Sequence, residues 1–413
     1  MQTKFKPTKT RFLFNVAIQN KEFKERLYCI PLRNYILPRK NELFSSWLAR
    51  VSTINFLQTT TFINMHFKEY KNWFTNRDLD ILVDKKIIKS FSKRMSLDES
   101  VLLKTSLKTY SGYLNEEIID KTRNNLISPI KRQGTYNNLY GLKYCPHCLK
   151  EENYFKKEWR LSFYNICLKH KSILLDRCPK CKEPLTITKR KYDLREFNCY
   201  NCGFKFEDAE TQSINPNSIA LERLNEAMTI LKQGWFEFDN RIYYSISYFK
   251  VVKQIAKIIF NQGFRKNDTL AKELEYLNIK LPTKELAKGK YLEEVLSVKE
   301  SLALFTAVFD IVKNSKSLES FIEENDINIY KLMQDMYERP YFYDEIIWKY
   351  RKQPYTPTYC EVKSAVKWMR NQGGMNVSWR ALSKLFGVYL SKSKRPELEE
   401  LIKRKRNHSY DCE

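Results

Sequence analysis

Eight residues of the types that bind zinc form two consecutive sets near the middle of the chain. The sets are Cys145-x-x-Cys148 with Cys167-x-x-His170, and Cys178-x-x-Cys181 with Cys199-x-x-Cys202. A two-residue gap lets both side chains of one turn reach one ion, and two such turns about 15–20 residues apart complete a tetrahedral site. The sequence therefore predicts two structural Zn²⁺ ions, in a Cys₃His and a Cys₄ site, with no open position for a catalytic water.

These spacings do not fit a zinc enzyme. His147 lies between two predicted ligands, but Cys148 already completes that turn, so His147 is not expected to bind metal. Zinc deaminases need H-x-E before P-C-x-x-C. Here proline follows the cysteine, in Cys145-Pro146 and Cys178-Pro179, and no H-x-E occurs. The chain also lacks the G-x-x-x-x-G-K-[ST] loop that would bind ATP. We therefore expect a protein that is not an enzyme.

Charge and cysteine usage limit the class of protein further. The 413 residues carry a formal net charge of +25, and seven thiolates with two Zn²⁺ would lower it to about +22. Such an excess indicates a polyanionic partner, with nucleic acid the usual one, although a low-GC genome also favours lysine. Cys29, Cys360 and Cys412 remain outside the two sets and suggest no disulfide framework. With no signal peptide and no apolar run near 18 residues, we expect a cytoplasmic, nucleoid-associated protein without a membrane span.

The predicted fold is mainly α, with a small central zinc-ribbon module and helix-turn-helix-like helical domains on either side. Its parts are an irregular N-terminal arm (1–40), an N-terminal helical domain (41–140), the double zinc-ribbon module (141–210), a helical domain (219–350) and a C-terminal helical subdomain with a possible helix-turn-helix and a basic tail (359–413).

Local patterns give more detailed expectations. Apolar residues at helical spacing predict a helix over Asn41–Gln58, with Asn41 as its N-cap. Apolar and aromatic runs predict ribbon strands within Trp159–Ile166 and Ser172–Leu175. Trp159 is expected to pack against the ribbons. Arg160 could brace the module or contact a partner.

The zinc motifs stand within a longer pattern that resembles the TniQ/TnsD family of transposition target selectors. The matching segments run in order from residue 28 to 206: Glu42–Arg50 (ELFSSWLAR, after Pro38), Leu142–Leu149 (LKYCPHCL), Trp159–Phe163 (WRLSF), Cys167–His170 (CLKH) and Leu174–Cys181 (LLDRCPKC). The resemblance covers nearly half of the chain, and its combined motif is specific.

The resemblance implies a non-catalytic adaptor that marks a transposon's insertion site and recruits an AAA+ ATPase, which in turn recruits the transposase. Some members read a fixed DNA site. Others dock, often as a homodimer, on a CRISPR surveillance complex that reads DNA through its guide RNA. Only about 200 residues follow the zinc module, which favours the docking mode. Direct reading of an attachment site, or a zinc-containing transcriptional or defence DNA-binding protein, remains the alternative.

Three parts of the chain could contact nucleic acid: Arg50, the basic run Lys189–Lys191 and the C-terminal region. Arg50 could reach a phosphate or form an internal salt bridge. Near the C-terminus Ser378 could cap a helix over Trp379–Phe386, with Gly387 in the turn and Tyr389–Arg395 entering a groove, although Pro396 would end that helix early or start another. The candidate nucleic-acid contacts are Arg50, Lys189, Arg190, Lys191, Arg380, Lys384, Lys392, Lys394, Arg395, Lys403, Arg404, Lys405 and Arg406.

Overall fold

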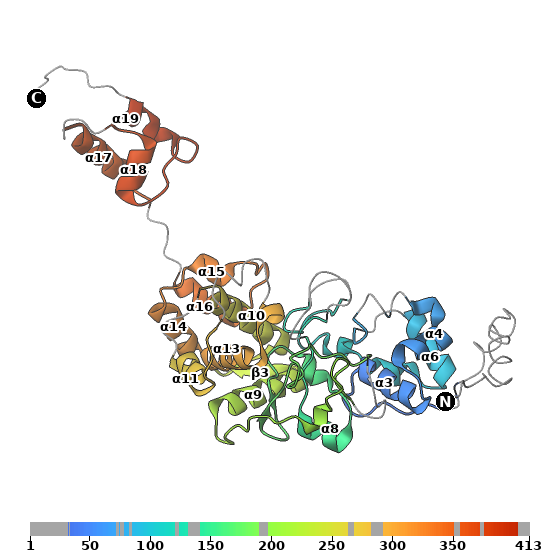
Figure 1. Cartoon of the computed structure of the whole chain (residues 1–413). Coiled ribbons are helices and arrows are strands. Elements are labelled where there is room, and N and C mark those ends of the chain that lie inside the picture. Colours follow the sequence, from blue (N-terminus) through green and yellow to red (C-terminus); the bar gives the residue numbers. More distant parts are fainter. Residues whose placement is uncertain are drawn as a thin grey trace, which may run out of the picture. The chain divides into compact units, whose positions relative to one another are not determined.

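The chain folds into two compact units, Met1–Ile346 and Ile347–Glu413. The structure is a computed structural model. It describes residues 32, 34–71, 74, 78–81, 85–119, 124–130, 141–189, 197–262, 268–281, 292–350, 356–371 and 376–403. Most of the expected irregular arm (1–40) therefore lies outside the described residues. Helices predominate in the described part of both units, as predicted (Figure 1).

The N-terminal helical domain surrounds an aromatic core. Its described elements are α3 (Phe44–Ile54), α4 (Thr59–His66), η1 (Lys68–Tyr70), α6 (Lys85–Met95), α7 (Glu99–Leu103) and η2 (Leu107–Tyr110). Trp47 of α3 and Phe91 of α6 are fully buried in this core, and the Phe91 ring stacks on Phe67 with centroids 3.7 Å apart. Apolar residues on one face of each helix thus hold α3, α4 and α6 together.

The predicted N-cap Asn41 is wrong. Helix α3 begins at Phe44, and its N-cap is Leu43. Asn41 instead adopts a left-handed conformation with φ 59°. Its carbonyl accepts a hydrogen bond from the backbone N–H of Lys157, 2.7 Å away. A contact with a distant segment therefore overrides the local capping preference of asparagine.

In its described residues, the cysteine-rich module (residues 141–210) contains little regular structure. Its elements are α8 (Pro146–Glu152), η3 (Lys157–Arg160), β1 (Ile166–Cys167), β2 (Ser172–Ile173) and η4 (Phe206–Asp208). The antiparallel pair β1–β2 aligns Cys167 with Ser172. The strand predicted within Trp159–Ile166 is therefore wrong except at its last residue. The strand predicted over Ser172–Leu175 is shorter than expected, although Leu175 bridges to Tyr144.

The region after the module is a helical bundle around α13. Its elements are α9 (Ile219–Gln233), β3 (Trp235–Phe238), β4 (Arg241–Tyr244), α10 (Ser245–Gln262), α11 (Asp268–Tyr276), α12 (Leu292–Val295), α13 (Val298–Ile311), α14 (Ser315–Glu324), α15 (Ile329–Met333) and α16 (Tyr341–Lys349). Eleven of the 14 residues of α13 are buried, and the helix packs against α9, α10, α11 and α14 (Figure 1). Its start is fixed by a capping box of Ser297 and Glu300.

A β-hairpin interrupts this bundle and was not foreseen. Strands β3 and β4 pair in antiparallel register, with Trp235 opposite Tyr244. Asp239 and Asn240 between them both have positive φ, 49° and 63°. Positive φ at both central residues is the requirement of a type I′ turn, which Asp and Asn tolerate. The alternating run from Trp235 to Tyr244 around Asp239-Asn240 was the sequence signal that could have predicted the hairpin.

The C-terminal unit packs α17 (Tyr359–Asn371), α18 (Trp379–Phe386), η5 (Pro396–Leu398) and α19 (Glu399–Lys403) around a small core that includes Val366 and Leu382. The predicted helix over Trp379–Phe386 is confirmed. The Ser378 side chain accepts a hydrogen bond from Ala381 N–H, and Gly387 ends the helix at φ 65°.

The recognition helix expected at Tyr389–Arg395 is wrong. Residues 389–395 form no helix. The Ser383 hydroxyl accepts a hydrogen bond from the Leu390 N–H and donates one to the Leu390 carbonyl, and the chain turns again at 392–394. Pro396 instead starts η5, which leads into α19.

Among the described residues, no helix has the length and apolar character needed to cross a membrane.

Candidate metal centres and the buried groups that hold them

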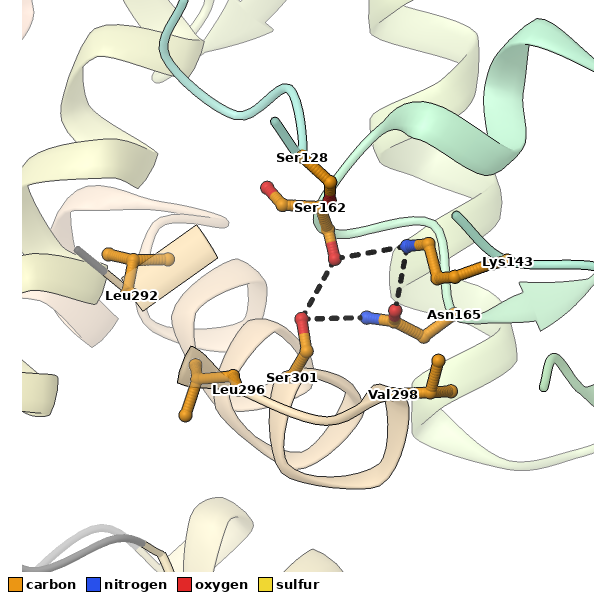
Figure 2. Close-up of a pocket in the computed structure, with 8 residues that line it drawn as sticks. All are labelled: Ser128, Lys143, Ser162, Asn165, Leu292, Leu296, Val298 and Ser301. Carbon is orange, nitrogen blue, oxygen red and sulfur yellow. Dashed lines mark hydrogen bonds between the residues drawn. The ribbon is translucent and has the colours of Figure 1, made fainter. Parts of the chain in front are cut away.

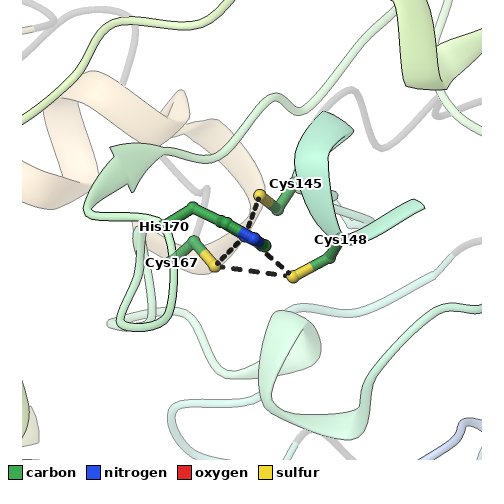
Figure 3. A group of neighbouring side chains, drawn as sticks. All are labelled: Cys145, Cys148, Cys167 and His170. Carbon is green, nitrogen blue, oxygen red and sulfur yellow. Dashed lines mark hydrogen bonds between the residues drawn. The ribbon is translucent and has the colours of Figure 1, made fainter. Parts of the chain in front are cut away.

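The first four predicted ligands converge on one point. Cys145 and Cys148 come from the start of α8, whereas Cys167 ends β1 and His170 lies in the turn before β2 (Figure 3). His170 Nδ1 lies 3.5 Å from Cys145 Sγ, 3.3 Å from Cys148 Sγ and 3.5 Å from Cys167 Sγ, and the last two sulfurs are 3.6 Å apart. The four donor atoms thus outline a small tetrahedron.

The second set converges in the same way. Cys178 Sγ lies 3.6 Å from Cys202 Sγ, and Cys181 Sγ lies 3.5 Å from Cys199 Sγ. In each set all donor atoms lie within 4.8 Å of one another, and these two sets are the only groups of this kind found in the described part of the chain. Both could therefore hold a metal ion.

The same backbone turn presents three of the four ligand pairs. Lys171, Lys182 and Gly203 each follow the second ligand of a pair, and each has positive φ, at 48°, 60° and 74°. Each donates its backbone N–H to the carbonyl of the first ligand, Cys167, Cys178 or Cys199, over 2.7 to 3.0 Å. The remaining pair, Cys145 and Cys148, uses the first turn of α8 instead. In these three pairs, the two-residue gap between ligands therefore forms the same hydrogen-bonded turn.

The donor chemistry fits Zn²⁺. A tetrahedral Zn²⁺ with Zn–S bonds of about 2.3 Å separates its sulfurs by about 3.8 Å, close to the observed spacings of 3.5 and 3.6 Å. Sets of four thiolates, or three thiolates and one imidazole, are the donor sets of structural zinc sites. The eight side chains are buried or half-buried. Both sets are thus compatible with a fully coordinated zinc ion.

Glu151 orients the histidine of the first set. Its Oε1 lies 3.0 Å from His170 Nε2, and its Oε2 pairs with Lys169. A carboxylate on one ring nitrogen fixes the tautomer that leaves the other nitrogen free for metal. Here that free nitrogen is Nδ1, which faces the three sulfurs. His147 is exposed, with its ring centroid 5.4 Å from that of His170, and is outside the donor set, as expected.

Arg160 links the cysteine-rich module to the N-terminal helical domain. Its side chain is fully buried and pairs with Asp78 at 2.5 Å and with Asp80 at 2.9 Å. It also donates two hydrogen bonds to the Ser128 carbonyl, over 3.2 and 2.8 Å. Asp80 in turn accepts the backbone N–H of Ser45 in the first turn of α3, 2.8 Å away. Of the two roles expected for Arg160, bracing the module or contacting a partner, the structure therefore shows the first.

The electrostatics of this cluster reflect burial. Burial raises the pKa of Asp80, and the Arg160 guanidinium opposes that rise. Burial alone would lower the pKa of Arg160, but the charges of Asp78 and Asp80 raise it overall. Each charge in the cluster depends on the others, because a buried charge without its partner is strongly unfavourable. Trp159, the preceding residue, is 1% exposed, which agrees with the packed position expected for it.

Lys143 links the module to α13 (Figure 2). Its buried ammonium donates to the Leu161 carbonyl at 2.6 Å and to Asn165 Oδ1 at 3.0 Å. Asn165 donates to Ser301 Oγ of α13 at 3.1 Å, and Ser301 donates to the Ser162 carbonyl at 2.8 Å. Burial lowers the pKa of Lys143 to about 7. The cavity among these groups measures about 10 Å³, which is room for one water at most, so its role is structural.

A second contact also joins the module to α13. Asp176 Oδ2 accepts the backbone N–H of Val298, the first residue of α13, over 2.7 Å. An anionic side chain at a helix N-terminus is stabilising. Arg160, Lys143 and Asp176 together make the module the centre to which both flanking helical regions of the first unit attach.

A cleft of about 480 Å³ lies between the N-terminal domain, the module and α9. Its lysines are largely engaged within the protein. Lys156 pairs with Glu152 and Lys169 with Glu151, and Lys157 donates to the Lys104 carbonyl at 2.7 Å and to Thr109 Oγ1 at 2.9 Å. These contacts leave the cleft little free charge for an anionic ligand.

Eight of the thirteen predicted nucleic-acid contacts lie among the described residues, two in the first unit and six in the second. Arg50 forms the internal salt bridge, 2.7 Å from the buried Glu42. Lys189, Arg380 and Lys384 are exposed, and Lys394 lies over the Tyr389 ring. Lys392 and Lys403 both pair with Glu399, and Arg395 pairs with Glu397. Arg190, Lys191, Arg404, Lys405 and Arg406 lie outside the described residues.

Taken together, the first unit is a helical scaffold organised around two closed Cys/His donor sets. The family model for TniQ matches residues 35–174, a segment that contains α3, the Arg160 cluster and the first donor set. The matched segment, about a third of the chain, is similar to the TniQ family. No curated protein matches the chain. The TniQ domain associates the chain with target selection in transposition.

Proposed function

We propose that this chain is a non-catalytic target-selection adaptor of a DNA transposon. It links the target site to an AAA+ ATPase and, through that ATPase, to the transposase. The observation that carries the proposal is the TniQ match, because the matched residues 35–174 include the first donor set and the buried groups that fix it to α3.

Two zinc ions serve this adaptor as structural elements. Each donor set supplies four protein atoms, which saturate a tetrahedral Zn²⁺ and leave no position for a water or substrate. Bound zinc would supply folding free energy rather than Lewis-acid chemistry. The surrounding residues position the ligands and the module. Glu151 orients His170, Arg160 attaches the module to the N-terminal helical domain, and Lys143 attaches it to α13 through Asn165.

The adaptor finds its target by docking, as a homodimer, on a CRISPR surveillance complex that carries a guide RNA. The C-terminal unit supports this mode, because residues 389–395 form no helix that could enter a groove after α18. The second candidate is direct reading of a fixed attachment site. It is favoured by Arg380 and Lys384, which are exposed one turn apart on α18.

Selection from a pool of random duplex DNA distinguishes the two modes. The docking mode predicts weak binding to every duplex, falling steeply with salt, and no enriched sequence. An enriched motif that survives at physiological salt would favour direct reading. In that case selection with a variant that carries both Arg380→Gln and Lys384→Gln should no longer enrich the motif. The same changes should leave a docking adaptor's general affinity nearly unaltered.

A further inference from the structure

Helix α6 of the N-terminal helical domain carries an unbalanced charge. Its eleven residues, Lys85–Met95 (KKIIKSFSKRM), include five basic residues and no acidic one. Arg94 is buried and donates to the His66 carbonyl, so it belongs to the core. Lys85, Lys86, Lys89 and Lys93 are exposed. These four form the lysine face of α6.

The lysine face lies opposite the buried face of the same helix. At 3.6 residues per turn, the four lysines fall within an arc of about 100°. Ile87, Ile88, Phe91 and Met95 are buried on the other side. The core contacts of Phe91, which stacks on Phe67 and packs against Phe44, therefore direct the lysines to solvent.

Three of the lysines on this face differ from several other basic residues in their ion pairing. Lys85, Lys89 and Lys93 form no ion pair with any residue that the structure describes, in contrast to Arg50, Lys392 and Lys403. Asp98, an acidic residue shortly after α6, accepts a hydrogen bond from the Ser100 backbone N–H and thereby caps α7. The three lysines are spaced by one helical turn, about 6 Å. This gives a row of positive charge about 12 Å long on a rigid element.

We infer that the lysine face of α6 binds the phosphate backbone of duplex DNA. A row of lysines on a helix neutralises successive phosphates, and it does so without reading bases, because lysine acts as a point charge. The inference rests on the proposed function and adds to it a surface where the adaptor holds DNA beside its target. The four lysines were not among the contacts expected from the sequence.

The test compares two variants with equal charge. One carries Lys85→Gln, Lys89→Gln and Lys93→Gln. The control carries Lys299→Gln, Lys316→Gln and Lys331→Gln, three exposed lysines of α13, α14 and α15. Glutamine preserves helix propensity. The full-length, zinc-loaded proteins are titrated with a random-sequence duplex at several salt concentrations, and their circular dichroism spectra verify folding.

We expect the α6 variant to lose at least about tenfold in affinity at about 0.1 M salt and to reduce the slope of log K against log salt by about 2.7, or 0.9 for each lost phosphate contact. The control should change affinity less than about twofold. Equal losses in both variants would overturn the inference, since net charge alone would then explain binding. Undiminished binding by a folded α6 variant would also overturn it.

A recruitment assay with the AAA+ ATPase separates this inference from the proposed function. If the α6 variant keeps its DNA affinity but no longer recruits the ATPase, the face contacts protein and the inference fails while the adaptor role stands. If the unaltered protein neither recruits the ATPase nor binds duplex, both fail. Loss of DNA affinity with recruitment intact supports the inference.

Discussion

The guanidinium of Arg160 lies 2.9 Å from Asp80 Oδ2, and both side chains are buried at the junction of the cysteine-rich module with α3. The residues are 80 positions apart in the chain. Asp80 simultaneously accepts the Ser45 backbone N–H. This ion pair thus joins the module to the N-terminal helical domain.

Replacing Arg160 by Met should destabilise the first unit by about 3–5 kcal/mol, because Asp78 and Asp80 would remain buried without their cation. Urea unfolding followed by tryptophan fluorescence measures this. The control is Lys250→Met, which removes an exposed pair with Glu116 and should cost less than about 1 kcal/mol. Equal effects in the two variants would mean that the Arg160 cluster has no special role.

Replacing Cys145 or Cys178 by Ser should destabilise the module by several kcal/mol, because a zinc site contributes its binding free energy to folding. Elemental analysis should give two zinc ions for the unaltered chain and fewer for each variant. Cys360→Ser is the control, since Cys360 is exposed and belongs to neither set. Soluble, metal-free variants with full activity would contradict the structural role of zinc.

Replacing Glu151 by Gln should weaken zinc binding by about 10–100-fold, the usual effect of losing a carboxylate behind a ligating histidine. Competition with a colorimetric chelator reports this affinity. Glu152→Gln is a matched neighbour, because Glu152 pairs with Lys156 and not with His170. Identical affinities for the two variants would show that Glu151 does not support the site.

The stability of the N-terminal helical domain should depend on His66 in mild acid. Burial, together with the positive charge of Arg94, lowers the pKa of His66 to about 4, whereas the unfolded value is about 6.5. The unfolded chain therefore gains a proton first, so this stability is fully present above about pH 6.5 and is lost as pH falls toward 4.

The measurement is the free energy of unfolding between about pH 7 and 5.5, a range in which metal release affects every variant alike. His66→Gln should lose less stability over this range than the unaltered chain. Identical pH profiles would exclude a contribution from His66.

Replacing Ser378 by Ala should weaken the C-terminal unit by about 1 kcal/mol through loss of the N-cap of α18. Hydrogen exchange of the α18 amides measures this local change. Ser393→Ala changes an exposed serine outside any helix and should leave those amides unaffected. Unchanged protection in the Ser378 variant would refute the cap.

Local chemistry explains what could be predicted from the sequence. Metal-ligand spacing depends on a few neighbouring residues, so the sequence predicted both four-residue sets that the structure brings together. Helix Trp379–Phe386 was found because Ser378 and Gly387 mark both of its ends. Residues 389–395 were mistaken for a helix because the Ser383 hydroxyl, seven positions before Leu390, forms hydrogen bonds with both the N–H and the carbonyl of Leu390.

Contacts between distant segments could not be predicted. Asparagine is a preferred N-cap residue, yet Asn41 lies before the helix, where its carbonyl accepts a hydrogen bond from Lys157 N–H. Arg160 was left with two possible roles because its partners Asp78 and Asp80 lie in another domain. The lysine face of α6 emerged only when the aromatic core showed which side of the helix is buried.

The central claim is that this chain selects the target and does not itself perform chemistry on DNA. The direct test is to sequence insertions made by the AAA+ ATPase and transposase of the same element, with the guide-RNA complex present, with and without this chain. We predict insertions clustered at a fixed distance from the guide's target only when the chain is present. Equally clustered insertions in its absence would contradict the account.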